Sequence, residues 1–381
     1  TLFRSQPTYA DEYGGDLAVG LYGNGGFTQS IQLGNPLLIP ERKREFEIGT
    51  DLRFFQDRLS VNFTYYQNTT EDLIIDIPIA NSRGFERTVG NGAIIENNGI
   101  EMDLSYLIYD DNDWNISATF LYSENNSNVV ELFDTESVNL GGLSAVSARV
   151  VEGEQFGVLW GSRTLRDENG NIVFDDNGFP VQDEEEGVIG DPNPDWRGSF
   201  ITNISYKSSR LSALFETFQG ADIYAGTKSV LYNLGTWGES GVETTTNQNL
   251  LEYNGNVIPA GTTFRGQVED FGAGPVALTE PWYLADGGFF SGGNDELYIE
   301  DGSWTRLREI ILGYNLTMPW LSARGIRSID LSLTGRNLLL WTPFEGNDPD
   351  TNLEGVSNAR GIDYFNNPST RSYVFTLNLN F

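Results

Sequence analysis

The sequence predicts an all-β fold and, within that class, a transmembrane, antiparallel, up-and-down β-barrel. Three observations support this prediction. Nine segments alternate apolar and polar residues with a period of two, the pattern of a strand with one apolar face. Short polar turns and long excursions connect these segments in an asymmetric way. The last residues, RSYVFTLNLNF, form an apolar strand without a tail, which a closed barrel protects because it has no free edge.

Composition excludes several classes of function. The chain has 381 residues, a formal net charge of −31, and no cysteine or histidine. The strong negative charge argues against nucleic-acid binding, which needs a basic face. The absence of cysteine and histidine excludes Cys/His catalysis, Cys/His metal sites and disulfides. No apolar run approaches the ~20 residues of a transmembrane helix. The start, TLFRSQPTYADEYGG, has no signal-peptide pattern, so we expect a removed signal or a longer product.

Four hairpins and a final strand account for the nine segments. The hairpins pair Arg44–Phe55 with Leu59–Thr69, Gly99–Asp110 with Trp114–Asn125, Ser199–Ser208 with Leu211–Gly220, and Ser303–Leu316 with Ile326–Thr342. Each is interpreted as two strands because its apolar residues recur at every second position. A further hairpin is expected near the start, around DLAVGLYG and FTQSIQLG. Helical periodicity is not sustained anywhere.

The connections predict which end of the barrel faces which side. Turns of about three polar residues resemble periplasmic turns, and long excursions resemble extracellular loops. The long ones are Ser127–Pro194, Ala221–Gly302 and Pro343–Pro368. A β-sandwich with disordered insertions is the alternative, although loops of this length are uncommon in compact soluble domains. Aromatic residues near strand ends fit the girdles at membrane interfaces, but tyrosine and tryptophan also favour strands in general.

Catalytic and metal sites have little support. Without histidine, a serine nucleophile would need a lysine base. Carboxylate pairs suited to a glycosidase exist, as they do on any acidic surface. In RDENGNIVFDDNGFP, Asp167, Asn169 and Asn171 alternate as in a calcium loop, but Ile172 replaces the expected glycine and the final glutamate is missing. We therefore expect no catalytic residues and no cofactor, with loop-bound calcium as a weaker alternative to two tight turns.

The longest loop, Ala221–Gly302, is rich in aromatic residues. Exposed aromatic side chains on loops often stack on sugar rings or dock a partner protein. They can equally pack the loop against itself, since a loop of this length needs some core of its own. The candidate contacts to a substrate or partner are Tyr232, Trp237, Trp282, Tyr283 and Phe289.

Five stretches and the last residue, taken in order, resemble one family. They are NPLLIPERKREFEIGTDLRFFQDRLSVNFTYYQNTTEDLI, GNGAIIENNGIEMDLSY, the segment from WGSRTLRDENG to IGDPNPDWRGSF, YIEDGSWTRLREIILGYNLTMP, GRNLLLWTPFEGNDPDTN, and Phe381. Each is short, but together they span most of the chain. In these stretches the chain resembles the C-terminal part of a SusC/RagA-type TonB-dependent outer-membrane transporter, the kind found in Bacteroidetes.

The resemblance implies how the chain is built into a larger protein. Barrels of this family have about 22 strands, so 1–381 would supply about half of one. A signal peptide, a plug domain and the first barrel strands would be absent from this chain. A half barrel cannot stay in lipid alone, so it must close against the missing half. The resemblance also implies that the last strand is a barrel-insertion signal, formed by Tyr373, Phe375, Leu377, Leu379 and Phe381.

The resemblance further implies active import of a bulky nutrient, a glycan or a peptide, across the cell outer membrane. TonB would act through the plug, a SusD-like surface lipoprotein would form a lid on the long loops, and lipid and lipopolysaccharide would surround the wall. No nucleic acid is expected as a partner. Two alternatives stay open at this point: a secreted β-protein that binds or cleaves glycans, and a non-transporting outer-membrane barrel.

Overall fold

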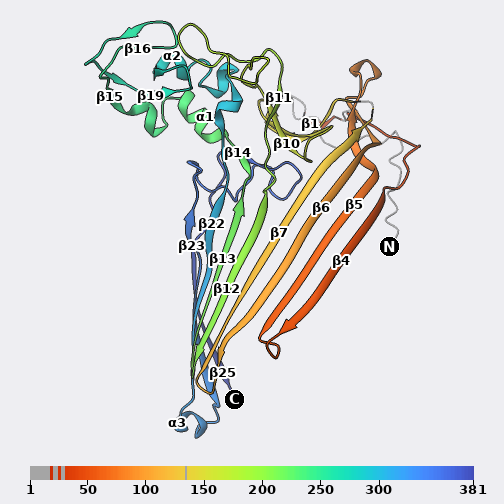
Figure 1. The fold of residues 1–381 in the computed structure, drawn as a ribbon, viewed down its shortest axis with the longest axis vertical. Coiled ribbons are helices and arrows are strands. Elements are labelled where there is room, and N and C mark those ends of the chain that lie inside the picture. Colours follow the sequence, from red (N-terminus) through yellow and green to blue (C-terminus); the bar gives the residue numbers. More distant parts are fainter. Residues whose placement is uncertain (1–17, 20–24, 27–30, 134) are drawn as a thin grey trace.

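The computed structural model describes residues 18–19, 25–26, 31–133 and 135–381. One large antiparallel sheet dominates it, with a region of folded loops at one end (Figure 1). Most of the hairpin predicted near the start lies outside the described residues. Of its first segment the structure describes β1 (Ala18–Val19), which pairs with β2 (Gly25–Gly26), and of its second segment Gln32–Leu33, which pairs with a strand of the large sheet instead. No helix in the described part of the chain is long and apolar enough to cross a membrane.

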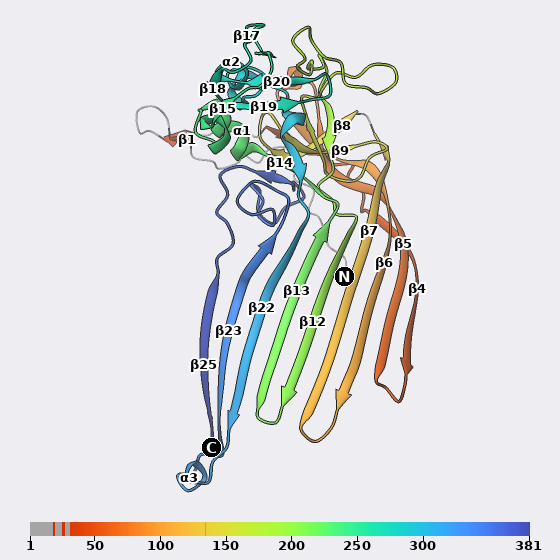
Figure 2. The same ribbon diagram turned by 60° about the vertical axis from the view of Figure 1, so that its left-hand side comes forward.

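All nine predicted strands are confirmed, and they lie side by side in chain order (Figure 2). They are β4 (Arg42–Phe54), β5 (Leu59–Pro78), β6 (Arg87–Asp110), β7 (Trp114–Leu132), β12 (Trp196–Tyr206), β13 (Ser209–Gln219), β22 (Trp304–Leu316), β23 (Ser328–Trp341) and β25 (Ser372–Asn380). The short β3 (Gln32–Leu33) runs parallel to β6. Strands β5, β6 and β7 extend further toward the folded loops than predicted. In these extensions apolar and polar residues no longer alternate strictly, but pairing with neighbouring strands continues.

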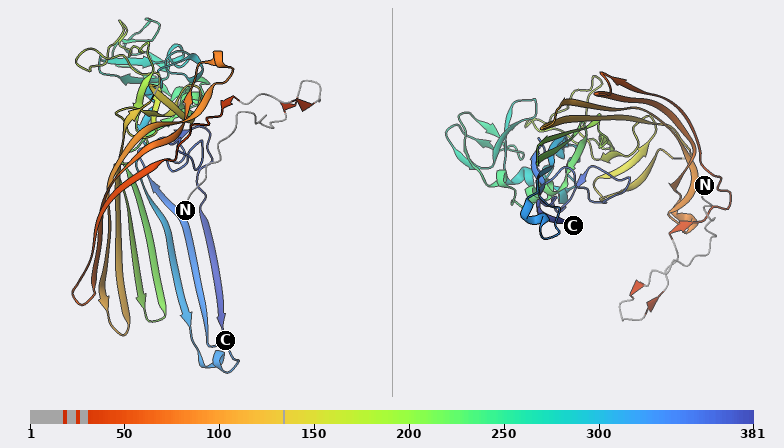
Figure 3. Two further views of the ribbon diagram at one scale, coloured as in Figure 1. Left: turned by 90° about the vertical axis from the view of Figure 1, so that its right-hand side faces the viewer. Right: turned by 90° about the horizontal axis from the view of Figure 1, so that it is seen from below.

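The sheet is curved and open. Seen along the strands, it forms an arc rather than a closed ring (Figure 3). Its edges are β4 and β25, and within the described residues these two strands do not pair with each other. The outer edges of both strands therefore present backbone donors and acceptors that a closed barrel would pair.

The inter-strand register gives the sheet two chemically different faces. On one face, apolar residues meet across every strand boundary: Phe63 pairs with Met102, Phe120 with Phe200, Leu211 with Leu312, and Leu333 with Phe375. On the other face, Asp103, Ser105, Asn203, Ser212 and Asp330 occupy the intervening positions. We call these the outer and inner faces. Alternation of this kind is the pattern of a barrel with a lipid-facing exterior and a polar interior.

Aromatic residues of the outer face gather beside the short turns. Trp114 pairs with Tyr206 in register, and their ring centroids are 4.3 Å apart. Tyr314 lies opposite Ser209 at the start of the next strand, so the three rings occupy a similar level. An aromatic band at the end of an apolar face is what a membrane interface favours, because the ring is apolar and its polar edge reaches water. The three rings therefore lie where a girdle would, and their contact with a membrane interface stays a prediction.

The turns at this end are short, as predicted. Between β4 and β5, Phe55, Gln56 and Asp57 have φ values of 55°, 57° and 66°, which lets the chain reverse within the four residues 55–58. The turn between β22 and β23 is longer and contains the single-turn helix α3 (Pro319–Ser322). Short turns leave this end of the sheet without folded loops, so any recognition surface belongs at the opposite end.

At the opposite end the long excursions form small sheets rather than disordered insertions. One sheet contains β8 (Ser137–Gly142), β9 (Ser147–Val151), β10 (Val158–Gly161) and β11 (Gly187–Gly190). A second joins β14 (Asp222–Ala225), β21 (Ile299–Asp301) and β24 (Ile362–Asp363). Three hairpins pair β15 (Glu243–Thr245) with β18 (Thr263–Arg265), β16 (Leu250–Leu251) with β17 (Val257–Ile258), and β19 (Gln267–Asp270) with β20 (Pro275–Leu278). The helices are α1 (Gly226–Asn233) and α2 (Glu280–Tyr283). We call residues 135–195, 221–303 and 342–371 the loop region.

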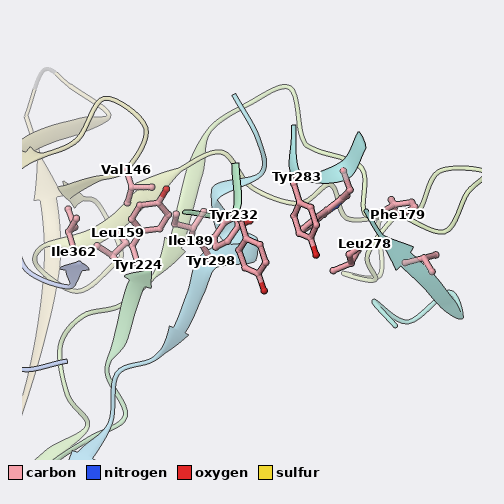
Figure 4. Close-up of a cluster of buried hydrophobic side chains, with 12 residues drawn as sticks. Val146, Leu159, Phe179, Ile189, Tyr224, Tyr232, Leu278, Tyr283, Tyr298 and Ile362 are labelled. Carbon is pink, nitrogen blue, oxygen red and sulfur yellow. The ribbon is translucent and has the colours of Figure 1, made fainter. Parts of the chain in front are cut away.

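The largest apolar core lies in the loop region and not on the sheet. Its twelve buried residues come from all three excursions (Figure 4): Val146, Leu159, Phe179, Ile189, Tyr224, Tyr232, Val276, Leu278, Trp282, Tyr283, Tyr298 and Ile362. Burial of large apolar side chains is the main stabilising term in folding. Since segments far apart in sequence share one core, the loops hold each other in place at the end of the strands.

Candidate functional site

The loop between β23 and β25 folds back onto the inner face of the sheet. Asp348 of this loop forms an ion pair with Arg306 of β22, and the two side chains are only 3% and 4% exposed. Asp348 also accepts hydrogen bonds from the backbone N–H groups of Ser369 (2.9 Å) and Asp350 (3.1 Å). Burial opposes ionisation of Asp348, but these donors and Arg306 outweigh it and hold its pKa below the ordinary value. The loop therefore carries a fixed negative charge against the wall.

Arg308 makes a second connection between this loop and the wall. Its guanidinium donates to Glu216 of β13 and, at 2.6 Å, to Asp350 of the loop. The charge of Arg308 is thus shared between two carboxylates. Because both Arg306 and Arg308 hold aspartates separated by one residue, the loop is fastened at two adjacent points.

Aromatic rings lie beneath these arginines on the inner face. Trp304 and Phe218 stack with centroids 5.8 Å apart and planes 3° from parallel. The guanidinium of Arg308 lies 4.9 Å from the Trp304 ring, and that of Arg197 lies 5.0 Å from the Phe218 ring. Cations over aromatic faces are attracted by the ring quadrupole, which orders side chains that would otherwise move freely.

A hollow of about 440 Å³ opens between the folded loop and the inner wall. Arg197, Glu216, Arg308 and Asp350 line it together with Arg360 of the loop. A second hollow of about 290 Å³ adjoins it and shares Arg360. Four asparagines line the second hollow, Asn97, Asn125, Asn193 and Asn358. Amide groups both donate and accept hydrogen bonds, so this surface suits hydroxyl or peptide groups of a solute. These residues form the candidate functional site.

The aromatic residues chosen from the sequence lie elsewhere, within the core of the loop region. Tyr232 and Tyr283 stack with centroids 5.1 Å apart, and Trp282 meets the Tyr283 ring edge-on at 5.3 Å. Trp237 packs against Tyr232, and Phe289 packs against the same core. The structure therefore brings these five residues into one aromatic cluster.

Burial corrects the role suggested for three of them. Tyr232, Trp282 and Tyr283 are only 3%, 5% and 4% exposed, so their rings pack the loop against itself and offer almost no surface to a ligand. Burial also raises the pKa of Tyr283 to about 12. Trp237 and Phe289 are partly exposed, and contact with a substrate or a partner stays a prediction for them. Their exposed neighbour Phe290, 63% exposed, was not chosen from the sequence.

The segment considered for calcium forms two tight turns. Oδ1 of Asp167 accepts hydrogen bonds from the backbone N–H groups of Asn169 (2.8 Å) and Asn171 (2.9 Å). Asp175 makes the same contacts to Asn177 and Phe179. The described residues contain no cluster of three or more acidic, His or Cys side chains arranged for a metal. Calcium binding here stays a prediction.

The last strand has the alternation expected of it. Four apolar side chains of β25 lie on the outer face, as its register with β23 shows, and all four are exposed: Tyr373, Phe375, Leu377 and Leu379. Phe381 follows β25 and is 75% exposed. The apolar surface of this strand is thus available for lipid, while its role as an insertion signal stays a prediction.

Sequence reasoning missed Arg197, Arg306, Arg308, Asp348 and Arg360. A usable signal existed in WTRLRE, because alternation places Trp304 and Arg306 on one face of a strand whose other face is apolar. Such a charge must face a polar interior rather than lipid.

The chain is similar to a known family of β-barrel proteins. A family model described as TonB dependent receptor-like, beta-barrel, matches residues 3–338. TonB-dependent receptor P3 of Formosa agariphila is 24% identical over 370 residues, covering 90% of this chain and 34% of the relative. TonB-dependent receptor P26 of the same organism is 26% identical over 373 residues, covering 91% and 35%. The chain thus spans about a third of the length of these relatives.

Solved structures share the fold. The RagAB peptide importer in the closed-closed state aligns with a TM-score of 0.64 at 21% identity, over 94% of this chain and 37% of that one. Another structure, of the RagAB peptide transporter, aligns with a TM-score of 0.65 over the same shares.

Proposed function

This chain belongs to the TonB-dependent receptor β-barrel family, and from that premise we propose that it forms part of an outer-membrane importer for a bulky nutrient. The nutrient is a glycan or a peptide, and the energy reaches the barrel through TonB. The family is one of receptors and not of enzymes, so the chain contributes wall and loops but no bond-making chemistry. The observation that carries the proposal is the mainly apolar outer face, on which apolar residues of neighbouring strands pair in register across all nine strands.

The importer needs more chain than these residues. Both edges of the sheet, β4 and β25, have free backbone groups, and such edges are not stable in lipid. We propose that 1–381 is the C-terminal part of the barrel. A segment with the first strands and a plug would close it, and TonB would act on that plug. The share of the relatives that the chain covers supports this arrangement.

The loop region is the proposed contact for a SusD-like surface lipoprotein. It lies at the end of the strands opposite the short turns, and its shared core keeps it rigid enough to support a lid. Its exposed apolar side chains, among them Leu234, Leu284 and Phe290, offer surface to such a partner. Lipid and lipopolysaccharide would contact the outer face.

Extraction of the native outer membrane tests the proposal. The receptor is tagged in an exposed loop of this chain, solubilised in detergent, and everything that copurifies is identified by mass spectrometry. Recovery of plug-bearing sequence together with a surface lipoprotein supports the importer. Recovery of a plug-free barrel indicates a non-transporting membrane protein, and recovery from the soluble fraction contradicts the membrane assignment.

A further inference from the structure

Two arginines of the candidate functional site lack the partners that the others have. Arg306 and Arg308 are neutralised by Asp348, Asp350 and Glu216. Arg197 and Arg360 line the same hollow, yet neither forms an ion pair with any carboxylate in the described part of the chain. Other described arginines also lack an ion pair, but these two line one hollow together.

The two charges act on each other. Arg360 is near enough to Arg197 to perturb it electrostatically, as is Asp350. Asp350 is already engaged by Arg308 at 2.6 Å, so its charge is shared. Like charges that line one hollow repel each other, and an anion placed between them replaces that repulsion with two attractions. The two guanidinium groups therefore favour a negatively charged group between them.

The structure holds the side chain of Arg197 and the backbone beside Arg360 in position. Arg197 lies on β12 and stacks its guanidinium over Phe218. Arg360 follows Ala359, which is 1% exposed and whose carbonyl accepts a hydrogen bond from Asn352 Nδ2 at 2.6 Å. One arginine thus belongs to the wall and the other to the folded loop. A guanidinium fork matches the geometry of a carboxylate and binds it with two parallel hydrogen bonds.

We propose that Arg197 and Arg360 bind a carboxylate of the imported solute. The solute is then an acidic oligomer, and the asparagines of the adjoining hollow accept and donate hydrogen bonds along the rest of it. This inference rests on the proposed import function and adds the chemistry of the cargo. The carboxylate belongs either to a uronic acid of an oligosaccharide or to a peptide, and the test separates these sources.

The test uses the complete receptor with its copurifying partners and compares charged with neutral ligand pools. One arm offers oligogalacturonides and their methyl esters, and the other offers a tryptone peptide digest and its methyl esters. Retained molecules are eluted and quantified by mass spectrometry. We expect at least one acid pool to be retained tenfold or more above its ester. That arm identifies the source of the carboxylate.

Variants then assign the preference to the two arginines. R197Q and R360Q should each reduce the acid-to-ester ratio to near one, while retention of the esters stays unchanged. R324Q, which removes an exposed arginine at the opposite end of the strands, should keep the full ratio. Wild-type protein that retains no acid pool above its ester in either arm overturns the proposal, as does an unchanged ratio in both variants.

Transport is measured separately in the same strains. Uptake of the retained pool should stop when the proton gradient is dissipated, because TonB needs that gradient. An acid preference without gradient-dependent uptake would overturn the import function and leave the carboxylate site standing. Gradient-dependent uptake without an acid preference would overturn the carboxylate site and leave the import function standing.

Discussion

Arg306 of β22 and Asp348 of the β23–β25 loop form a buried ion pair, in which Nη1 lies 3.3 Å from Oδ2 and a shorter contact joins Nη2 to Oδ1. The pair fastens the loop to the inner face of the sheet, in addition to the apolar contacts of Phe344 and Ile362. It also positions the loop that carries Arg360, so the candidate functional site depends on it.

Asp348→Asn should release the loop. The substitution leaves Arg306 buried without a counter-charge, and breaking a buried pair from one side costs about 3–5 kcal/mol. Hydrogen exchange of residues 342–371 should accelerate strongly, while exchange in β12 and β13 stays unchanged. Glu354→Gln, an exposed position in the same loop, serves as the control. Unchanged exchange in the Asp348 variant would mean that the ion pair with Arg306 does not hold the loop in place.

Anchoring of the loop should resist acid. The pKa of Asp348 is lowered on folding, so its ionised form contributes stability that is fully present above the ordinary aspartate pKa of about 3.9. That contribution is lost only as the pH falls through the lower pKa of the folded state. The difference in loop exchange between wild type and Asp348→Asn should therefore stay constant from about pH 7 to about pH 4 and shrink below that. Shrinkage that begins near neutral pH would contradict the pair.

Gly99→Ala should impair assembly of the sheet. A Cβ at this position of β6 would lie 2.3 Å from the Glu124 carbonyl oxygen and 2.4 Å from the Tyr66 hydroxyl. The tyrosine side chain lies across the glycine on the inner face, so there is no room for a methyl group. Overpacking of this kind costs about 1–3 kcal/mol. The heat-resistant, fast-migrating barrel form on gels should decrease, whereas Gly238→Ala, with no atom within 4 Å, should leave it unchanged.

The aromatic cluster should act as a core and its exposed neighbour as a contact. Trp282→Ala should destabilise the loop region by about 3–5 kcal/mol and increase proteolysis there, because the residue is 5% exposed. Phe290→Ala should leave proteolysis unchanged and weaken binding of the copurifying lipoprotein. Normal proteolysis in the Trp282 variant would contradict its placement in the core.

The sequence predicted the sheet far better than the site. Period-two alternation is a local property, so each of the nine long strands of the large sheet could be predicted from its own residues. Burial of Tyr232, Trp282 and Tyr283 depends on three excursions meeting in one core, and no local pattern reports that. Similarly, Arg306 and Asp348 are 42 positions apart, and only the fold brings them together. Aromatic content alone does not distinguish buried rings from exposed ones.

Alternate residues of the long strands should face lipid and a polar lumen. Cysteine labelling in intact outer membranes tests this arrangement most directly. These 381 residues contain no cysteine, so single cysteines are placed at Leu331, Ser332, Leu333 and Thr334 of β23. A water-soluble maleimide should label positions 332 and 334, and a lipid-soluble one should label 331 and 333, in agreement with the register to β25. Equal labelling of all four positions by the water-soluble reagent would contradict a membrane-spanning wall.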